Sequence, residues 1–239
     1  MTTLALAGAA HAATLFELPL NPFFGGNTRN KVSSDAWPSE NHYTLTKVTV
    51  DAPGGWAIDR VTVYNQHNYP MTDQGFIDAF GPTVLQGAYL QIIPEGDLAS
   101  FVPGMVGDYY TGAEATITEL SAGSLARAGA NQTVVDPAAD IVLGPGTYWI
   151  GVTPEIDNFS AVYGVQFGKT ATDAAGAIAR YAEAGSLTGG TAASVTGVWE
   201  ETSGSGLSIL VEGTAVPEPG SAALLGIAAL GLALRRRRS

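Results

Sequence analysis

Hydrophobic and polar residues alternate in short stretches along most of the chain, and the stretches end at turns rich in Gly, Pro or Asp. Alternation with a period of two is typical of β-strands that bury one face. No long stretch of the body keeps a 3.6-residue period, so the pattern predicts an all-β fold, an antiparallel β-sandwich or barrel. The predicted strands are residues 45–50, 60–64, 84–93, 113–120, 147–153, 160–167 and 207–213.

The clearest strand pattern reads Thr-Tyr-Trp-Ile-Gly-Val-Thr and follows a Gly-Pro-Gly turn. Neighbouring residues of a strand face opposite ways, so only one of two adjacent side chains is expected in the core. Tryptophan has a large apolar ring, and we interpret Trp149 and Trp199 as core residues rather than ligand-stacking residues. The predicted core residues are either Tyr148 or Trp149, either Ile150 or Val152, and both Ile209 and Val211.

One segment of the body has a different composition. Residues 172–184 are rich in alanine, the strongest helix former, and they include Ile178 and Tyr181. We predict a short helix there, although Gly176 and Gly185 weaken the pattern.

The end of the chain is apolar and then strongly basic. Residues 221–234 are Ala, Leu, Gly, Ile and Ser without a charge, and the next four residues are Arg235, Arg236, Arg237 and Arg238. A helix over residues 220–234 would be about 22 Å long, short for a hydrocarbon core of about 30 Å. Arginine side chains can extend toward the interface, and positive charge after an apolar helix favours the cytoplasmic side. We predict a single transmembrane helix with the arginines as its membrane stop; the alternative is a buried C-terminal helix.

The N-terminus has features of an export signal. Residues 4–10 are apolar, and Ala10-His11-Ala12 has the A-x-A form of a cleavage site, so Ala10 and Ala12 are the predicted cleavage residues and Ala13 the mature N-terminus. No positive charge precedes Leu4, so residues 1–12 are interpreted as a partial signal peptide that begins upstream. The alternative is a disordered, Ala-rich terminus.

Charge and cysteine content exclude several functions. The chain has 22 acidic and 11 basic residues, a net charge of −11. Four of the basic residues are the terminal arginines and one acidic residue is Glu218, so the body alone has 7 basic and 21 acidic residues, a net charge of −14. Such a surface repels nucleic acid, which we do not expect as a partner. The chain has no cysteine, which excludes disulfides, thiol catalysis and thiolate metal sites.

Residues 216–239 resemble the PEP-CTERM sorting signal of Gram-negative bacteria. Val216, Pro217, Glu218 and Pro219 are followed by the apolar run and the arginine cluster, in the order of that signal. The resemblance implies an exosortase, a membrane-embedded cysteine transpeptidase, as a partner that cuts near Pro217–Pro219. It also implies export, transient anchoring in the inner membrane, and a final location at the cell surface or in extracellular polysaccharide.

The body has a weaker resemblance to domains that carry such tails. Residues 143–150, Trp199, a Gly-Ser-Gly turn and the last predicted strand resemble β-sandwich domains found with PEP-CTERM signals. This implies a jelly-roll-like sandwich similar to carbohydrate-binding modules, without fixing a ligand. The expected organisation is a partial signal peptide at 1–12, a β-sandwich domain at 13–213 and a sorting and anchor segment at 216–239.

Catalytic motifs are missing from the sequence. His42 and His67 have no metal-spaced partner and are interpreted as surface or loop residues, and no G-x-S-x-G, GxGxxG or P-loop motif occurs. The polar loop at residues 65–69 is a possible recognition loop, with a solvated loop as the simpler interpretation. We therefore predict no catalytic residue, no metal ligand and no cofactor, while a Ca²⁺ site built from loop carboxylates stays open without named ligands.

Three functions remain open at this point. The first is a non-enzymatic surface or matrix protein, the second is a carbohydrate-binding module with an exposed aromatic row, and the third is a secreted hydrolase with two converging carboxylates. The first is favoured because every strong signal in the sequence concerns destination.

Overall fold

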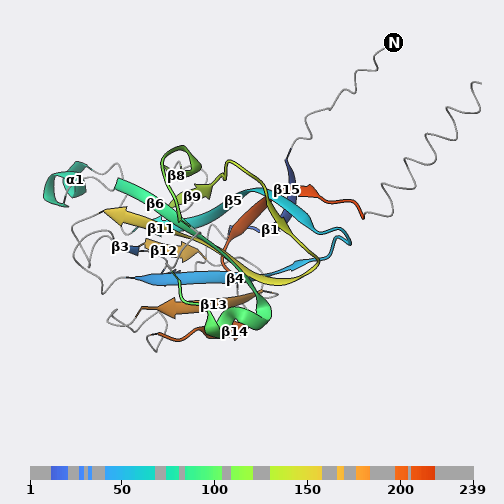
Figure 1. The fold of residues 1–239 in the computed structure, drawn as a ribbon. Coiled ribbons are helices and arrows are strands. Elements are labelled where there is room, and N and C mark those ends of the chain that lie inside the picture. The colour runs from blue at the N-terminus through green and yellow to red at the C-terminus, as the bar shows by residue number, and fades with distance from the viewer. Residues whose placement is uncertain are drawn as a thin grey trace, which may run out of the picture.

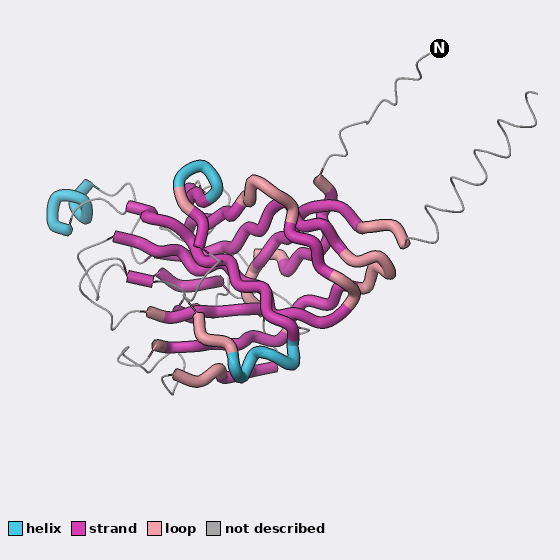
Figure 2. The backbone as a smooth tube through the Cα atoms, viewed as in Figure 1, coloured by secondary structure: helices cyan, strands magenta, loops and turns pink. Residues whose placement is uncertain are grey.

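The fold consists of two β-sheets that pack face to face, as the computed structural model shows (Figure 1). The structure describes residues 12–20, 27–29, 32–33, 41–67, 74–80, 84–103, 109–120, 130–157, 166–169, 176–183, 197–203 and 206–218. Strands fill the body, and short helices lie at its periphery (Figure 2). An all-β, antiparallel two-sheet body was predicted from the alternating pattern and is confirmed.

The first sheet is built around one long strand, β5, which pairs with β15 and β12 on one side and with β9 and β10 on the other. β15 in turn pairs with β1, so the first and last strands of the body are neighbours. In the described part of the chain this sheet has eight strands: β1 (Ala13–Leu18), β2 (Asn27–Arg29), β5 (Trp56–His67), β8 (Ala115–Glu119), β9 (Ala130–Val135), β10 (Ile141–Leu143), β12 (Gln166–Lys169) and β15 (Ile209–Ala215).

The second sheet has the order β14-β13-β4-β11-β6-β7, with a short parallel strand, β3, beside the end of β11. Its seven strands within the described ranges are β3 (Val32–Ser33), β4 (His42–Val50), β6 (Val84–Pro94), β7 (Tyr109–Tyr110), β11 (Gly146–Asp157), β13 (Ala177–Ala182) and β14 (Glu200–Ser203). In the part of the chain that the structure describes, the short helices are α1 (Gln74–Phe80) and two 3₁₀ turns, η2 (Glu95–Ser100) and η3 (Gly112–Glu114).

A β-bulge in β5 decides which side chains of the first sheet face outward. Ile58 and Val61 are both fully buried, so the inward positions change from even to odd numbers between them. The register against β15 shifts at the same place, and Asp59 is the extra residue. Beyond the bulge the outward residues of β5 are Arg60, Thr62 and Tyr64.

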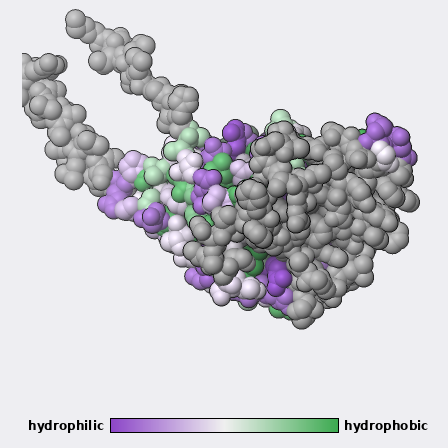
Figure 3. Space-filling view, turned by 180° about the vertical axis from the view of Figure 1, so that it is seen from behind, coloured by the Kyte–Doolittle hydropathy of each residue, from purple (hydrophilic) through white to green (hydrophobic). Residues whose placement is uncertain are grey.

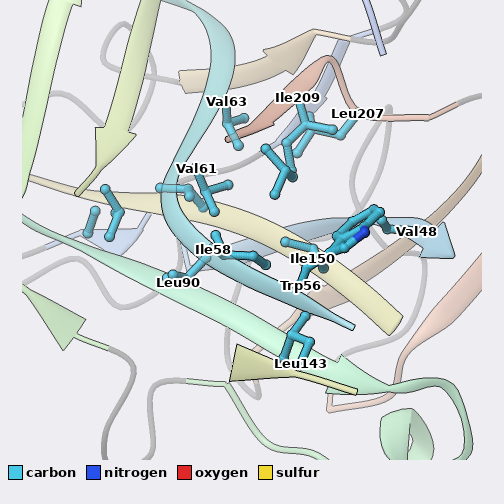
Figure 4. Close-up of a cluster of buried hydrophobic side chains, with 14 of the residues drawn as sticks. Val48, Trp56, Ile58, Val61, Val63, Leu90, Leu143, Ile150, Leu207 and Ile209 are labelled. Atoms are coloured by element: carbon cyan, nitrogen blue, oxygen red, sulfur yellow. The ribbon is translucent and has the colours of Figure 1, made fainter. Parts of the chain in front are cut away.

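The main hydrophobic core lies between the two sheets. In Figure 4, Val63, Ile209 and Leu207 lie together, and Trp56 lies beside Val48 and Ile150. Both sheets contribute β-branched residues, whose shape suits packing on a pleated surface. The predicted burial of Ile209 and Val211 is confirmed, because neither residue has any exposed surface.

A second cluster covers the outer face of the second sheet. It contains Trp149 of β11 and Leu98 of η2, and the Lys47 ammonium lies 4.7 Å from the centre of the Trp149 ring. β11 is therefore buried on both faces. The sequence analysis expected only one of two adjacent side chains of this strand to be buried, so the second buried face is a correction. Trp149 is fully buried while Tyr148 packs against the core between the sheets. The prediction that Trp149 and Trp199 belong to the core is confirmed.

The predicted helix at residues 172–184 is wrong where the structure describes that segment. Residues 177–182 form β13, which pairs with β4 on one side and β14 on the other. Alanine favours a helix only weakly, and two rows of strand pairing outweigh that preference. Ala179 and Ala182 are fully buried here, so their small side chains suit positions against neighbouring strands.

Three other predictions lie largely or wholly outside the described residues. The predicted strand at 160–167 lies outside the described residues except for its last two positions, which belong to β12. The predicted transmembrane helix at 220–234 and the four arginines also lie outside them. In the part of the chain that is described, no helix combines the length and apolar character needed to cross a membrane.

Truncation of Ile209 tests the position of the core. Ile209→Ala should lower the free energy of unfolding by about 2–5 kcal/mol, because a buried isoleucine loses its contacts and leaves a cavity. Val142→Ala is the control, since Val142 is 70 % exposed and its truncation should cost less than about 0.5 kcal/mol. Urea unfolding followed by tryptophan fluorescence measures both values. Equal, small losses would place Ile209 at the surface.

Candidate functional site

The sorting motif begins where the last strand of the body ends. β15 pairs with β5 as far as Ala215, and the Val216 amide donates a hydrogen bond of 2.9 Å to the Gly55 carbonyl oxygen. Val216 is half-buried, whereas Pro217 and Glu218 are exposed. Three of the four predicted motif residues are therefore described, and their side chains become accessible as the chain leaves the sheet. Pro219 lies outside the described residues.

The predicted signal cleavage site lies at the same end of the body. Ala12 is exposed, and the next residue, Ala13, is the first residue of β1 and pairs with Gly213 of β15. β1 and β15 lie side by side in Figure 1. Ala10, the other predicted cleavage residue, lies outside the described residues. The two predicted processing sites thus flank one pair of neighbouring strands.

The outer face of the first sheet has a shallow depression of about 370 Å³. Its floor is made by side chains that face outward from neighbouring strands, and the bulge in β5 puts three of them there. Tyr64 pairs across the strands with Gln132, and Arg60 pairs with Glu212. The lining residues with hydrogen-bonding groups are Arg60, Thr62, Tyr64, Thr116, Gln132, Asp136 and Glu212.

One guanidinium group holds two carboxylates at the edge of this depression. Arg60 Nη2 lies 2.7 Å from Asp136 Oδ2, and Arg60 Nη1 lies 3.8 Å from Glu212 Oε2. The hydrogen bond to Asp136, the largest influence, raises the pKa of Arg60. Asp136 and Glu212 therefore share one counter-ion. This is an ion-pair network between β5, β15 and the residue that follows β9, whereas a glycoside hydrolase needs one carboxyl free to give a proton and one free to act as base or nucleophile.

Five aromatic residues form a row across the outer face of the second sheet. Tyr109 pairs with Tyr89, and Tyr181 pairs with Tyr43. The ring centroids are 4.7 Å apart for Tyr109 and Tyr89, 6.2 Å for Tyr89 and Tyr43, 6.2 Å for Tyr43 and Tyr181, and 5.2 Å for Tyr181 and Trp199. These spacings are those of interacting aromatic pairs.

Most of the aromatic row is buried. Tyr43, Tyr181 and Trp199 are buried, and the Trp199 indole donates a hydrogen bond of 2.9 Å to the Phe101 carbonyl oxygen. Tyr109, at 41 % exposure, is the most accessible ring. A ring can stack on a sugar only where its face is accessible, and three of these five rings are buried, so this row serves mainly for packing.

Burial and neighbouring carboxylates raise the pKa values of the tyrosines of this row, so these are weaker acids than an exposed tyrosine. Burial, followed by the charge of Glu183, raises the pKa of Tyr43, whose hydroxyl donates a hydrogen bond of 3.3 Å to Glu183 Oε1. Burial, followed by a hydrogen bond to Glu155, raises the pKa of Tyr109. Both phenols therefore stay protonated where an ordinary tyrosine begins to ionise.

Two polar residues were placed wrongly from the sequence. His42, interpreted as a surface or loop residue, is 2 % exposed at the start of β4, where it pairs with Ala182. Asn65, expected in an exposed polar loop, is 1 % exposed within β5 and donates a hydrogen bond of 3.0 Å to Thr133 Oγ1. Both strands extend further than their apolar pattern indicated. A hydrogen-bonded pair can replace apolar side chains inside a sheet, and no local signal reveals such a partner.

In the described ranges, no three His, Asp or Glu side chains form a group that could hold a metal ion.

The residues of the depression were not found from the sequence. Alternation alone predicts which residues of a strand share a face, but not that Arg60 meets Glu212 of β15 and Asp136, the residue after β9.

Comparison with known proteins identifies the C-terminal segment. Residues 215–238 match the family model described as the PEP-CTERM protein-sorting motif. The resemblance predicted from the tail is confirmed, and the motif implies export and processing by an exosortase at the membrane. No curated protein and no solved structure matches the chain.

The tyrosine row should make the body less stable above about pH 10. In this range tyrosines of the unfolded chain lose protons, while Tyr43 and Tyr109 keep theirs in the fold because their pKa values are raised. The folded state then binds more protons than the unfolded state, so the free energy of unfolding falls as the pH rises. Urea midpoints measured from pH 8 to pH 11 would show this fall. A Tyr43→Phe, Tyr109→Phe variant should lose less stability over the same range; an unchanged pH dependence would assign the effect elsewhere.

Proposed function

We propose that the protein is a non-enzymatic cargo of the exosortase pathway that is exported, anchored briefly in the inner membrane and released to the cell surface or extracellular matrix. The observation that carries this proposal is the PEP-CTERM motif at residues 215–238, which starts at the last residue of β15. Pro217 and Glu218 are exposed, so a processing enzyme at the membrane can reach their side chains.

The features of the body that support this proposal lie on its surface. Its two candidate sites are an ion-pair network on one sheet and a largely buried aromatic row on the other. The net charge of −14 after loss of the tail favours a protein that stays dispersed outside the cell. Figure 3 shows hydrophilic and hydrophobic residues interspersed over the described part of one face.

The order of the strands supports a jelly roll. The row β1-β15-β5-β9 faces the row β4-β11-β6-β7, and the chain crosses repeatedly between the two sheets. First and last strands that pair, with crossings between the sheets, are typical of the two Greek keys of a jelly roll. In this interpretation β13 and β14 extend the second sheet beyond the eight-stranded pattern.

Processing of the tail is the direct test of the sorting function. In the native host, mass spectrometry of the mature protein should find no peptide that spans residues 216–234, because the exosortase removes the tail. Replacing Pro217, Glu218 and Pro219 with alanine should keep the tail attached. Replacing the four arginines with serine should weaken membrane retention of the uncut form, because each arginine contributes about 1 kcal/mol of attraction to the membrane surface. Full-length protein recovered from the cytosol would contradict the proposal.

A second candidate function is glycan binding in the depression on the first sheet. The observation that favours it is the position of Tyr64, a half-buried aromatic ring beside Gln132, Thr62 and the Arg60 ion pairs. Sugars bind through an apolar ring face and surrounding hydrogen bonds, and this floor offers both. The aromatic row of the second sheet is less suitable because most of its rings are buried.

Retention on purified exopolysaccharide of the host tests this second function. Tyr64→Ala should weaken retention about tenfold, which corresponds to about 1.4 kcal/mol. Tyr109→Ala is the matched control, since it removes an exposed tyrosine from the other sheet. Equal retention of the wild type and both variants, or no retention of any, would leave the depression without a glycan-binding role.

A further inference from the structure

The turn between β4 and β5 lies against the start of the sorting motif. This turn, residues 52–55, is closed by a hydrogen bond of 2.8 Å from the Gly55 amide to the Ala52 carbonyl oxygen. The Gly55 carbonyl then accepts the hydrogen bond from the Val216 amide at 2.9 Å. Two segments about 160 residues apart in sequence therefore meet at the point where the motif leaves the body.

Glycine at position 54 is required for this contact. A Cβ atom at Gly54 would collide with the Val216 carbonyl oxygen and lie 2.8 Å from the Pro217 carbonyl carbon. The backbones of the turn and the motif are thus packed directly on each other, with no side chain between them. Gly55 has a φ of +88°, a conformation that favours glycine, and it orients the carbonyl that Val216 uses.

The residues just before the motif are also fixed. Thr214 pairs with Ala57, and Ala215 pairs with Trp56, which is 3 % exposed. An enzyme that binds its substrate as an extended peptide pairs with the main-chain hydrogen-bonding groups of that peptide. Here the upstream side of the motif is already a strand of the body, so the enzyme and β5 compete for the same backbone groups.

We propose that the 52–55 turn is a clamp on the sorting motif and that exosortase processing requires residues 214–216 to separate from β5. Gly54 and Gly55 are then positioning residues for the sorting reaction: they act through Val216 and touch no reacting atom. This inference rests on the proposed processing of the tail. It assigns to the folded body a control over how fast its own sorting signal is cut.

Separation of this strand end is physically accessible. β1 pairs with β15 only up to Gly213, so among the described residues Thr214 and Ala215 are paired on the β5 side alone. Strand ends with one row of hydrogen bonds open locally at much lower free energy than the whole domain. The core residues Ile209 and Val211 remain in place, so the motif can be released while the body stays folded.

Gly54→Ala tests the clamp, with Gly96→Ala as the matched control because a Cβ at Gly96 meets no atom within 4 Å. The added methyl group of Gly54→Ala pushes Val216 away, so the tail should be cut faster in a pulse-chase experiment in the native host, by about five- to tenfold if the rate follows the released fraction. Gly96→Ala should be processed at the wild-type rate. Equal or slower processing of a folded Gly54→Ala protein overturns the proposal.

A reversible lock tests the same step from the opposite direction. Ala57 and Thr214 are cross-strand partners, and hydrogen-bonded antiparallel partners have Cα atoms about 5.5 Å apart, within the range for a disulfide. The chain has no other cysteine, so Ala57→Cys, Thr214→Cys forms one defined bond. The oxidised double variant should lose processing, and reductant should restore it. Each single cysteine variant should behave as the wild type, whereas undiminished processing of the oxidised lock contradicts the clamp.

Hydrogen exchange separates failure of the clamp from failure of the sorting function. In purified full-length wild-type protein the Val216 amide should exchange slowly, and in Gly54→Ala it should exchange at the rate of an unstructured peptide while the amides of Ile209 and Val211 stay protected. Rapid exchange of Val216 in the wild type overturns the clamp even where the tail is cut. An uncut wild-type tail in the host overturns the sorting function, and the exchange result then decides the clamp on its own.

Discussion

The antiparallel pairing of β15 with β5 is the interaction on which the rest of the structure depends. The inner side of this pair, with Val63 and Ile209, forms the centre of the core between the sheets. Its outer side, with Arg60 and Glu212, forms the edge of the depression. Its end presents the sorting motif. One row of backbone hydrogen bonds therefore links the stability of the body, the depression on the first sheet and the start of the sorting motif. A shift of register by one residue would exchange the inward and outward side chains of β15.

Much of this architecture could be predicted from sequence because it depends on local pattern. Rough alternation indicated the strand around residues 84–93, and β-branched and aromatic residues next to turns indicated those around 45–50 and 147–153. A linear motif such as the sorting signal can be recognised without any fold. The rest depends on contacts between distant segments. Residues 177–182 favour a helix on composition and become a strand because two neighbouring strands pair with them. The bulge at Asp59 turns Arg60 outward, and no residue near it in sequence indicates that Asp136 will be its partner.

The two outer faces of the sandwich differ in what lies on them. Among the described residues, a cluster of buried hydrophobic side chains lies over the second sheet, whereas the first sheet has the polar depression. On the second sheet, Leu98 of η2 and Trp199 cover β11 and β13, so Trp149 is buried as completely as the residues of the central core. The first sheet keeps Arg60 and Tyr64 accessible over β5. A strand with both faces buried reads as a continuous apolar run, while a strand with one polar face alternates. The pattern of the strongest predicted strand, with Trp149 and Ile150 side by side, follows from this difference.

The place of β15 inside the first sheet has a mechanical consequence. A protein that is held through its C-terminal end is loaded along β15 whenever it is pulled. Because β15 lies between β1 and β5, the force is shared by two rows of hydrogen bonds that run beside it, and many of them must shear together before the strand slides. An edge strand under the same load would have only one such row to resist it. When it is held in this way, the sandwich is loaded through a strand with neighbours on both sides, and the segment beyond Gly213, which among the described residues pairs only with β5, is the first part to yield.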